Sequence, residues 1–212
     1  MNIYFATKTS NGLLNLNNAI IVCDGNSLTS GGYGGETYPN LLLSKLSQKY
    51  TGITIINKGS GGQTTPEIIS DAVSDIDINI DEEKINILCV WEVGNDIYYN
   101  GSVSQAINNI TTYCQARKLA GWKVVLLGLS DRFQSTAFGD NQSQYRAKLS
   151  EANMILKNTY KTIGADVFID IGSDSRLQDA TDLSYFYSDS VHLIQAGNNV
   201  VADMVMKGLR KL

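Results

Sequence analysis

Residues 19–29 read AIIVCDGNSLT, an apolar run that gives way at once to small polar residues. The run Ala19–Cys23 is rich in Ile and Val and nearly continuous in apolarity, which is typical of a strand buried on both faces of a sheet. Gly25, Asn26 and Ser27 then supply the small residues of a tight turn from strand to helix. The stretch therefore predicts the first strand and turn of a βα unit.

Five such apolar runs alternate with longer segments of helical character. The predicted strands are Ala19–Cys23, Ile53–Asn57, Ile85–Val93, Lys123–Leu129 and Asp166–Ile171. The predicted helices are Tyr38–Gln48, Pro66–Ile76, Ser102–Ala120, Gln142–Ile163 and Ile194–Leu212. Because strand-helix alternation favours right-handed crossovers, the pattern predicts an α/β fold with one mainly parallel five-stranded sheet covered on both faces.

The length and composition of the chain are those of one globular domain. Its 212 residues suit a single large α/β domain, and 43% apolar against 18% charged residues indicates a packed core rather than a disordered chain. The 17 basic and 21 acidic residues give a net charge of −4 with no basic stripe, so we expect no nucleic-acid partner. No apolar run approaches about 18 residues, so no membrane span is predicted.

The first 18 residues are rich in asparagine and do not fit the alternation. We expect residues 1–18 to form an N-terminal extension or an extra strand, and residues 19–212 to form the single domain. The segment lacks the basic and apolar regions of a signal peptide. This predicts a cytoplasmic protein or a component of a phage or surface assembly.

The three cysteines, Cys23, Cys89 and Cys114, are odd in number, widely spaced and without a CxxC motif. We expect them to be buried reduced thiols. The chain has a single histidine, His192, far from any pair of cysteines. A metal site is therefore not expected.

Small polar residues and glycines gather where the predicted strands end. The segments after the first, second, third and fifth strands contain DGNSLTSGGYGG, KGSGGQTT, GNDIYYNG and YSDSVHLIQAG. In a parallel sheet, ligands bind beyond the carboxyl ends of the strands, near the topological switch point. The sequence therefore predicts a site built from these four loops.

Two of the loops offer the groups of a nucleophilic mechanism. Asp189 precedes His192 by three residues, so a helical turn would place both on one face, where the carboxylate orients the imidazole. The alternative is an aspartate that caps a helix beside an incidental histidine. Ser27 at a strand-to-helix turn would present its hydroxyl at the sheet edge, but taken on its own the residue is better explained as a helix N-cap. The GxSxG nucleophile elbow is not matched, because Thr29 replaces its final glycine.

The remaining loops offer hydrogen-bond donors for an oxyanion. Gly59, Gly61 and Gly62 permit close approach of backbone N–H groups, and Asn95 carries an amide at the end of the third strand. A glycine-rich loop also binds phosphate in other proteins, but GSGGQTT lacks the lysine of a P-loop. We expect the glycines 31–35 to form a flexible rim that exposes Tyr33.

Taken together, these stretches resemble the four ordered sequence blocks of the SGNH-hydrolase family, also called GDSL esterases and lipases, from about Ala19 to the final helix. The blocks are GNSLT at 25–29, NKGSGGQTT at 57–65, GND at 94–96 and DSVH at 189–192. The resemblance implies a three-layer α/β/α sandwich of flavodoxin-like topology. It also implies ester hydrolysis without metal or organic cofactor.

The resemblance further implies a role for individual residues. Ser27 would be the nucleophile, His192 the general base and then acid, and Asp189 its orienting partner. The oxyanion hole would comprise the N–H groups of Ser27 and Gly62 and the side chain of Asn95. Two positions depart from the family pattern: Asn26 replaces the aspartate of GDSL, and Gly61 stands where serine is common.

The substrate is predicted less sharply than the mechanism. Aromatic and polar residues of the expected rim suit a saccharide. They include the predicted substrate contacts Tyr33, Trp91, Tyr98 and Arg132, together with Tyr38, Tyr99, Phe133 and Tyr187. Trp91 lies within a predicted strand, and that position favours a core residue over a substrate contact. The first expectation is deacetylation of an acetylated carbohydrate. The alternatives are a short-chain acyl-ester or thioester hydrolase, a lysophospholipase, or a glycan-binding module with weak or no turnover.

Overall fold

The computed structural model describes residues 14–133 and 142–212, which contain a five-stranded sheet with every strand pair parallel. The strands are β1 (Ala19–Gly25), β2 (Thr54–Asn57), β3 (Ile85–Trp91), β4 (Lys123–Leu127) and β5 (Val167–Ile169). Their order across the sheet is β2-β1-β3-β4-β5. This is the flavodoxin-like order, and its winding reverses between β1 and β3. The predicted parallel sheet is confirmed.

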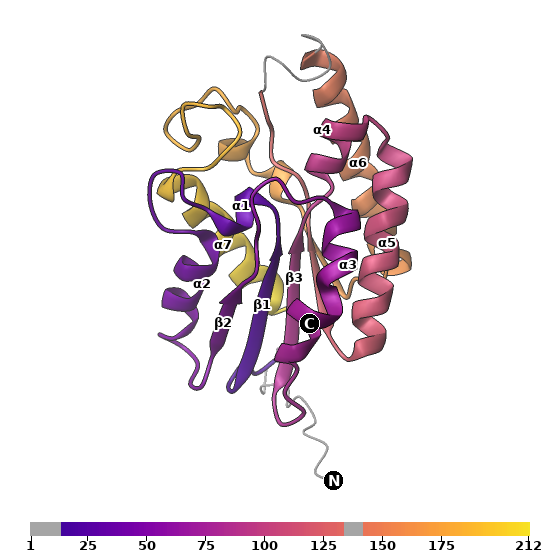
Figure 1. Ribbon diagram of the computed structural model, residues 1–212. Coiled ribbons are helices and arrows are strands. Elements are labelled where there is room, and N and C mark those ends of the chain that lie inside the picture. Colours follow the sequence, from indigo (N-terminus) through magenta and orange to yellow (C-terminus); the bar gives the residue numbers. More distant parts are fainter. Residues whose placement is uncertain (1–13, 134–141) are drawn as a thin grey trace.

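Helices cover both faces of this sheet (Figure 1). One layer contains α2 (Tyr38–Leu46) and α7 (Gln195–Leu209), which pack against each other. The other layer contains α3 (Thr65–Asp75), α5 (Val103–Ala120) and α6 (Gln142–Ile163). The short elements are α1 (Ser27–Ser30), α4 (Gly94–Asn100), η1 (Asp77–Asn79), η2 (Ile171–Ser173) and η3 (Ser175–Leu177). The described residues thus form the expected three-layer α/β/α sandwich.

The apolar strands are explained by two cores, one on each face of the sheet. Along β1, Ile21 and Cys23 pack toward α2 and α7, whereas Ile20 and Val22 pack toward the opposite layer. Both faces are buried, so positions 19–23 of the strand all carry apolar side chains. All three cysteines are free and buried, as predicted.

Three strands end two residues before their predicted ends, at Trp91, Leu127 and Ile169. The apolar pattern continues beyond each strand because the following loops also contribute buried residues. Val93, Leu129 and Ile171 are all buried although their backbones lie outside the strands. Apolarity therefore marks burial here rather than strand pairing.

The predicted N-terminal extension is described only from residue 14 onward. Leu14 and Leu16 are buried against the α2/α7 core, directly before β1. Residues 1–13 lie outside the described residues, so the extension or extra strand stays a prediction. In the part of the chain that the structure describes, none of the helices has the length and apolarity needed to cross a bilayer.

Candidate active site

Ser27 is the first residue of α1, and Asn26 is the residue that caps this helix. The Asn26 side-chain oxygen accepts a hydrogen bond from the Leu28 N–H over 3.0 Å. Asparagine caps a helix as well as aspartate does, so the loss of the family's carboxylate leaves the turn intact. Because Asn26 is the cap, the Ser27 hydroxyl takes no part in capping the helix. The Ser27 N–H belongs to the first turn, where N–H groups have no acceptor within the helix.

The turn before Ser27 depends on a close backbone approach. Gly25 has φ +142°, and a Cβ there would lie 2.2 Å from the carbonyl oxygen of Trp91 on the neighbouring strand β3. Only glycine fits this position. The chain can therefore turn sharply at the carboxyl end of β1 and leave Ser27 at the edge of the sheet.

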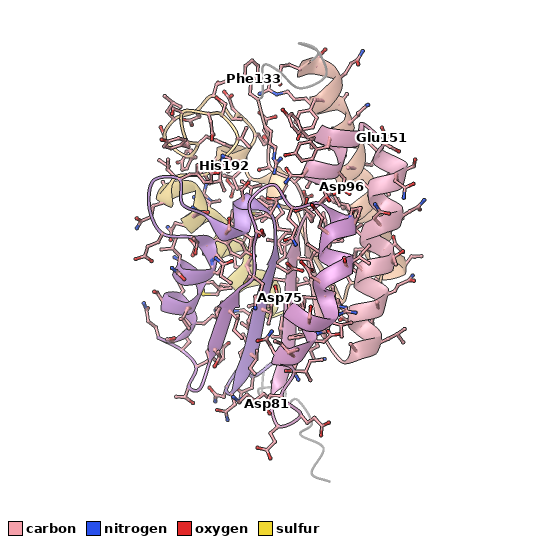
Figure 2. All side chains as sticks on the ribbon, viewed as in Figure 1. Asp75, Asp81, Asp96, Phe133, Glu151 and His192 are labelled. Carbon is pink, nitrogen blue, oxygen red and sulfur yellow. The ribbon has the colours of Figure 1, made fainter. Side chains whose placement is uncertain are left out.

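Two hydrogen bonds connect the three predicted triad residues. His192 Nε2 lies 2.8 Å from Ser27 Oγ, and His192 Nδ1 lies 2.5 Å from Asp189 Oδ2. The other Asp189 oxygen accepts the N–H groups of Val191 and His192, each over 3.0 Å. Figure 2 shows His192 and Asp96 toward one end of the molecule and Asp81 at the other. The arrangement can pass a proton from the serine to an oriented imidazole.

The electrostatics of the site favour the neutral form of His192 and the ionised form of Asp189. Burial lowers the pKa of His192 below its usual value, and the positive charge of Arg132 adds to this effect against the opposing influence of Asp189. Burial of Asp189 acts to raise its pKa, but hydrogen bonds from His192 and Val191 lower it overall. A neutral imidazole beside an ionised carboxylate is the protonation state that a general base needs.

The residues of the predicted oxyanion hole, Ser27, Gly62 and Asn95, line one cavity of about 190 Å³. Among the described residues, it is lined by Ser27, Tyr33, Gly61, Gly62, Asn95, Tyr98, Tyr99, Arg132, Val191 and His192. Gly62 adopts φ +78°, a left-handed conformation that favours glycine. Gly59 has a different role from the one considered for it, because a Cβ there would lie 2.3 Å from the Ser30 nitrogen of α1. It permits two loops to pack together.

Hydrogen bonds orient the Asn95 side chain from both ends. Its Nδ2 donates to the Gln63 carbonyl over 2.8 Å, which leaves a second N–H for a ligand. Its Oδ1 accepts from Arg132 Nη1 over 2.9 Å. Val93, directly before α4, has φ +88°, an uncommon conformation for a β-branched residue, and it is fully buried. The chain thus fixes both the amide and the backbone that carries it.

Further contacts tie three of the four sequence blocks to one another. Asp96 accepts hydrogen bonds from the N–H of Thr65, over 3.0 Å, and from its hydroxyl, which joins α4 to the start of α3. Asn57 donates to the Thr29 carbonyl over 2.9 Å. These contacts connect the second block of sequence to the first and third. The aspartate of GND therefore serves the framework of the site, a role the sequence reading did not assign.

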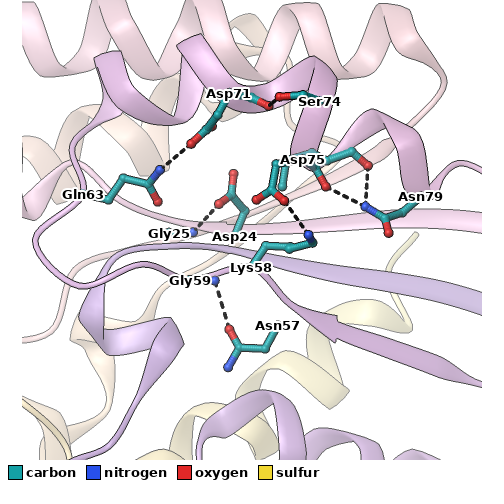
Figure 3. Close-up of polar contacts among 11 residues, drawn as sticks. Asp24, Gly25, Asn57, Lys58, Gly59, Gln63, Asp71, Ser74, Asp75 and Asn79 are labelled. Carbon is teal, nitrogen blue, oxygen red and sulfur yellow. Dashed lines mark hydrogen bonds and ion pairs between the residues drawn. The ribbon is translucent and has the colours of Figure 1, made fainter.

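A buried acidic residue lies directly behind the nucleophile turn. Asp24 is 2% exposed, and burial raises its pKa to about 7 despite hydrogen bonds from Tyr113 and from the Gly25 N–H. Figure 3 shows Asp24 near two further carboxylates, those of Asp71 and Asp75. Asp75 pairs with Lys58, and Asp71 accepts a hydrogen bond from Gln63.

Arg132 differs from the substrate contact that the sequence predicts. It lines the cavity, but it is 4% exposed and its guanidinium holds Asn95. A Cβ on Gly94 would lie 3.2 Å from the guanidinium carbon, so the glycine of GND makes room for this arginine. Glu92 is fully buried nearby, without a hydrogen-bond partner for either oxygen among the described residues, and burial raises its pKa well above the usual range.

Five of the other predicted rim residues divide into two groups, whereas Phe133 and Tyr187 are exposed and do not line the cavity. Tyr98 and Tyr99 line the cavity, and Tyr33 does so from the glycine loop. Trp91 and Tyr38 are fully buried in the core and contact each other edge-on, so their assignment to the rim is wrong. Trp91 points into the core because alternate positions of β3 face the α2/α7 layer. Tyr33 is also not an exposed rim residue, since its ring stacks on His192.

Comparisons with known proteins bear on the family and the fold of the chain. A sequence model of the GDSL-like lipase/acylhydrolase family matches residues 23–200. An acetylxylan esterase from Geobacillus stearothermophilus has 15% identity and a TM-score of 0.66, with 91% of this chain and 94% of that chain covered. A family 3 carbohydrate esterase from Clostridium thermocellum has 19% identity and a TM-score of 0.65, with 90% and 94% covered. No curated protein matches the chain.

At these identities the solved structures show a shared fold, whereas the family match spans most of the chain. It runs from the last residues of β1 into α7 and so includes all four loops of the site. The chain therefore belongs to the GDSL-like lipase/acylhydrolase family, also called SGNH hydrolases, and is a carboxylic ester hydrolase.

Proposed function

We propose that the chain hydrolyses short-chain acyl esters with Ser27 as nucleophile, His192 as base and Asp189 as its orienting partner. The observation that carries this proposal is the continuous Ser27–His192–Asp189 hydrogen-bond chain beside a cavity. Neutral His192 takes the Ser27 proton while Oγ attacks the ester carbonyl carbon. The carbonyl oxygen becomes an anion that the N–H groups of Ser27 and Gly62 and the Asn95 amide hold.

The second half of the reaction uses the same groups. The imidazolium returns its proton to the alkoxide, which leaves as the alcohol and gives an acyl-serine. Water then loses a proton to His192 and attacks the acyl carbon, and Ser27 recovers its proton as the acid leaves. In each half of the reaction, one bond to the acyl carbon forms and one breaks, and one proton passes through His192.

We further infer that the acyl group is acetyl and that the alcohol is a saccharide. The cavity of about 190 Å³ suits a small acyl group, and Val191 is the one aliphatic side chain among the described lining residues. Tyr98 and Tyr99 offer aromatic surface beside the nucleophile, which suits the apolar face of a sugar ring. The two esterases of similar fold are named as an acetylxylan esterase and a carbohydrate esterase. Their names support a saccharide ester as the substrate class.

The catalytic assignment is tested with Ser27→Ala. Hydrolysis of p-nitrophenyl acetate should be abolished, and a fluorophosphonate probe that labels the unaltered protein should fail to label the variant. Undiminished turnover by a clean preparation of the variant would overturn the assignment. An unaltered protein that binds acetylated glycans but never reacts with the probe would instead indicate a glycan-binding module.

The acyl preference is tested by comparing acetyl with octanoyl esters of one alcohol, followed by a panel of acetylated oligosaccharides. We expect kcat/KM to be higher for the acetyl ester, because the cavity offers little apolar surface for a long chain. A strong preference for octanoyl would favour a lipid substrate such as a lysophospholipid.

A further inference from the structure

The ring of Tyr33 lies flat on the imidazole of His192. The ring centroids are 3.5 Å apart and the planes differ by 3°. Tyr187 contacts the same tyrosine ring edge-on, with centroids 5.9 Å apart at 63°. Tyr33 therefore covers one face of the imidazole and is itself supported from a second side.

The loop that carries Tyr33 has a backbone that places the ring there. Gly31, Gly32, Gly34 and Gly35 all have positive φ angles, of +74°, +104°, +87° and +134°. A Cβ on Gly35 would lie 2.5 Å from the Cβ of Gln195 at the start of α7. The glycines thus allow the loop to pack closely against the segment that follows His192.

The geometry of the stack favours a charged imidazole over a neutral one. Two neutral aromatic rings prefer an offset or edge-on arrangement, because centred parallel rings place like quadrupoles face to face. A cation centred over a tyrosine face is attracted to the same quadrupole. A contact that strengthens as His192 becomes cationic stabilises the transition state more than the ground state.

We propose that Tyr33 is a positioning residue that fixes the plane of the His192 ring and stabilises the imidazolium formed when His192 takes the Ser27 proton. The proposal rests on the catalytic role proposed above for His192. Other groups also act on this ring: Asp189 favours the imidazolium, and Arg132, from the loop after β4, disfavours it. Tyr33 adds a neutral contact that favours the cation without placing a second carboxylate at the site.

The test uses the fact that His192 is the only histidine of the chain. Its ring protons can be followed by NMR through a pH titration without ambiguity. Tyr33→Phe retains the ring, whereas Tyr33→Leu retains an apolar cover but removes the π-face. Tyr99→Leu is the matched control. Tyr99 lines the same cavity, but among the described residues its ring contacts that of Tyr98 and not that of His192.

We expect Tyr33→Leu to lower the pKa of His192 and Tyr33→Phe and Tyr99→Leu to leave it unchanged. At a pH where His192 is neutral, Tyr33→Leu should lower kcat roughly 3- to 10-fold with a smaller change in KM, and Tyr33→Phe should restore kcat. An unchanged or raised pKa in Tyr33→Leu would overturn the proposal. A Tyr33→Phe variant as slow as Tyr33→Leu would also overturn it, since the hydroxyl would then be the active group.

The titration separates this proposal from the proposed function. It reports on the imidazole whether or not the protein turns over an ester. Activity that survives Ser27→Ala would refute the catalytic assignment and leave the titration result standing. A normal loss of activity in Ser27→Ala, together with a titration that ignores Tyr33, would refute the stacking role alone.

Discussion

Arg132 donates a hydrogen bond from Nη1 to the side-chain oxygen of Asn95 over 2.9 Å, and Asn95 lines the cavity beside Ser27. A donor that is itself hydrogen-bonded to a cation is both oriented and polarised. The same guanidinium lowers the pKa of His192. One buried arginine therefore acts on two parts of the proposed machinery.

Replacing Arg132 should separate these two effects. Arg132→Met should lower kcat about 10-fold or more, because the Asn95 amide loses its support, and should move the acid limb of kcat/KM to higher pH, because removal of the positive charge raises the pKa of His192. Arg132→Lys retains the charge and should leave the acid limb in place while kcat still falls. pH-rate profiles with p-nitrophenyl acetate measure both; an unshifted acid limb in Arg132→Met would contradict the electrostatic effect.

The unaltered enzyme should remain active below the usual titration range of histidine. Burial lowers the pKa of His192, so the neutral base persists to a pH below the ordinary value of 6.5 before protonation removes it. The acid limb of kcat/KM should therefore have its midpoint below 6.5. A midpoint above that value would show that Asp189 outweighs burial.

Gly62 and its neighbour Gly61 offer a matched pair of substitutions. Gly62→Ala should destabilise the fold by about 1–2 kcal/mol, because alanine is strained at φ +78°, and should lower kcat by misplacing an oxyanion donor. Gly61 has no positive φ, and a Cβ there meets nothing within 4 Å. Urea unfolding should show little loss of stability for Gly61→Ala. Equal losses for both variants would refute the conformational argument.

Asp24 should make the stability of the protein depend on pH. Burial raises its native pKa to about 7 from an ordinary 3.8, so the native state keeps a proton that the unfolded chain releases. The contribution of this group to stability therefore falls as pH rises from about 4 to about 7. Asp24→Asn lacks this loss, and its stability relative to the unaltered protein should increase over that window by a few kcal/mol at most.

Urea unfolding at about pH 4 and about pH 7.5 measures this difference. Asp81→Asn is a suitable control, because Asp81 lies at the end of the molecule away from His192 and hydrogen bonding from the Glu83 N–H lowers its pKa (Figure 2). Its stability relative to the unaltered protein should not increase with pH. A flat difference for Asp24→Asn as well would show that the carboxyl is ionised in the native state.

The sequence predicted the architecture well because the dominant signal is burial. The nearly continuous apolarity of β1 and β3 follows from the burial of both faces of the sheet, and α6 has the predicted bounds Gln142 and Ile163. The helix α4 escaped prediction because its seven residues, starting at Gly94, are too few to show a helical period. Sequence alone also cannot tell a nucleophilic serine from one that caps a helix; in the structure Asn26 is the cap, and the Ser27 hydroxyl lies beside His192.

The contacts of the site were harder to predict than its residues. The stack of Tyr33 on His192 depends on four glycine conformations, and a glycine-rich sequence permits many. The bond from Arg132 to Asn95 joins loops that are distant in the sequence, with no motif to mark it. Trp91 was wrongly predicted to contact the substrate for a different reason. An aromatic side chain near the end of a strand can face either side of the sheet, and the side that Trp91 faces is known only from the packed structure.

The link from Asp96 to Thr65 bears on how the substrate preference of this scaffold can change. It joins two of the loops through residues that do not line the cavity, whereas Tyr98 and Tyr99 do line it and take no part in that link. Substrate preference can therefore drift, or be engineered, through the two tyrosines at little cost to the alignment of the reacting groups. A library varied at Tyr98 and Tyr99 should retain folded, probe-reactive members with altered ester preference far more often than one varied at Thr65 and Asp96.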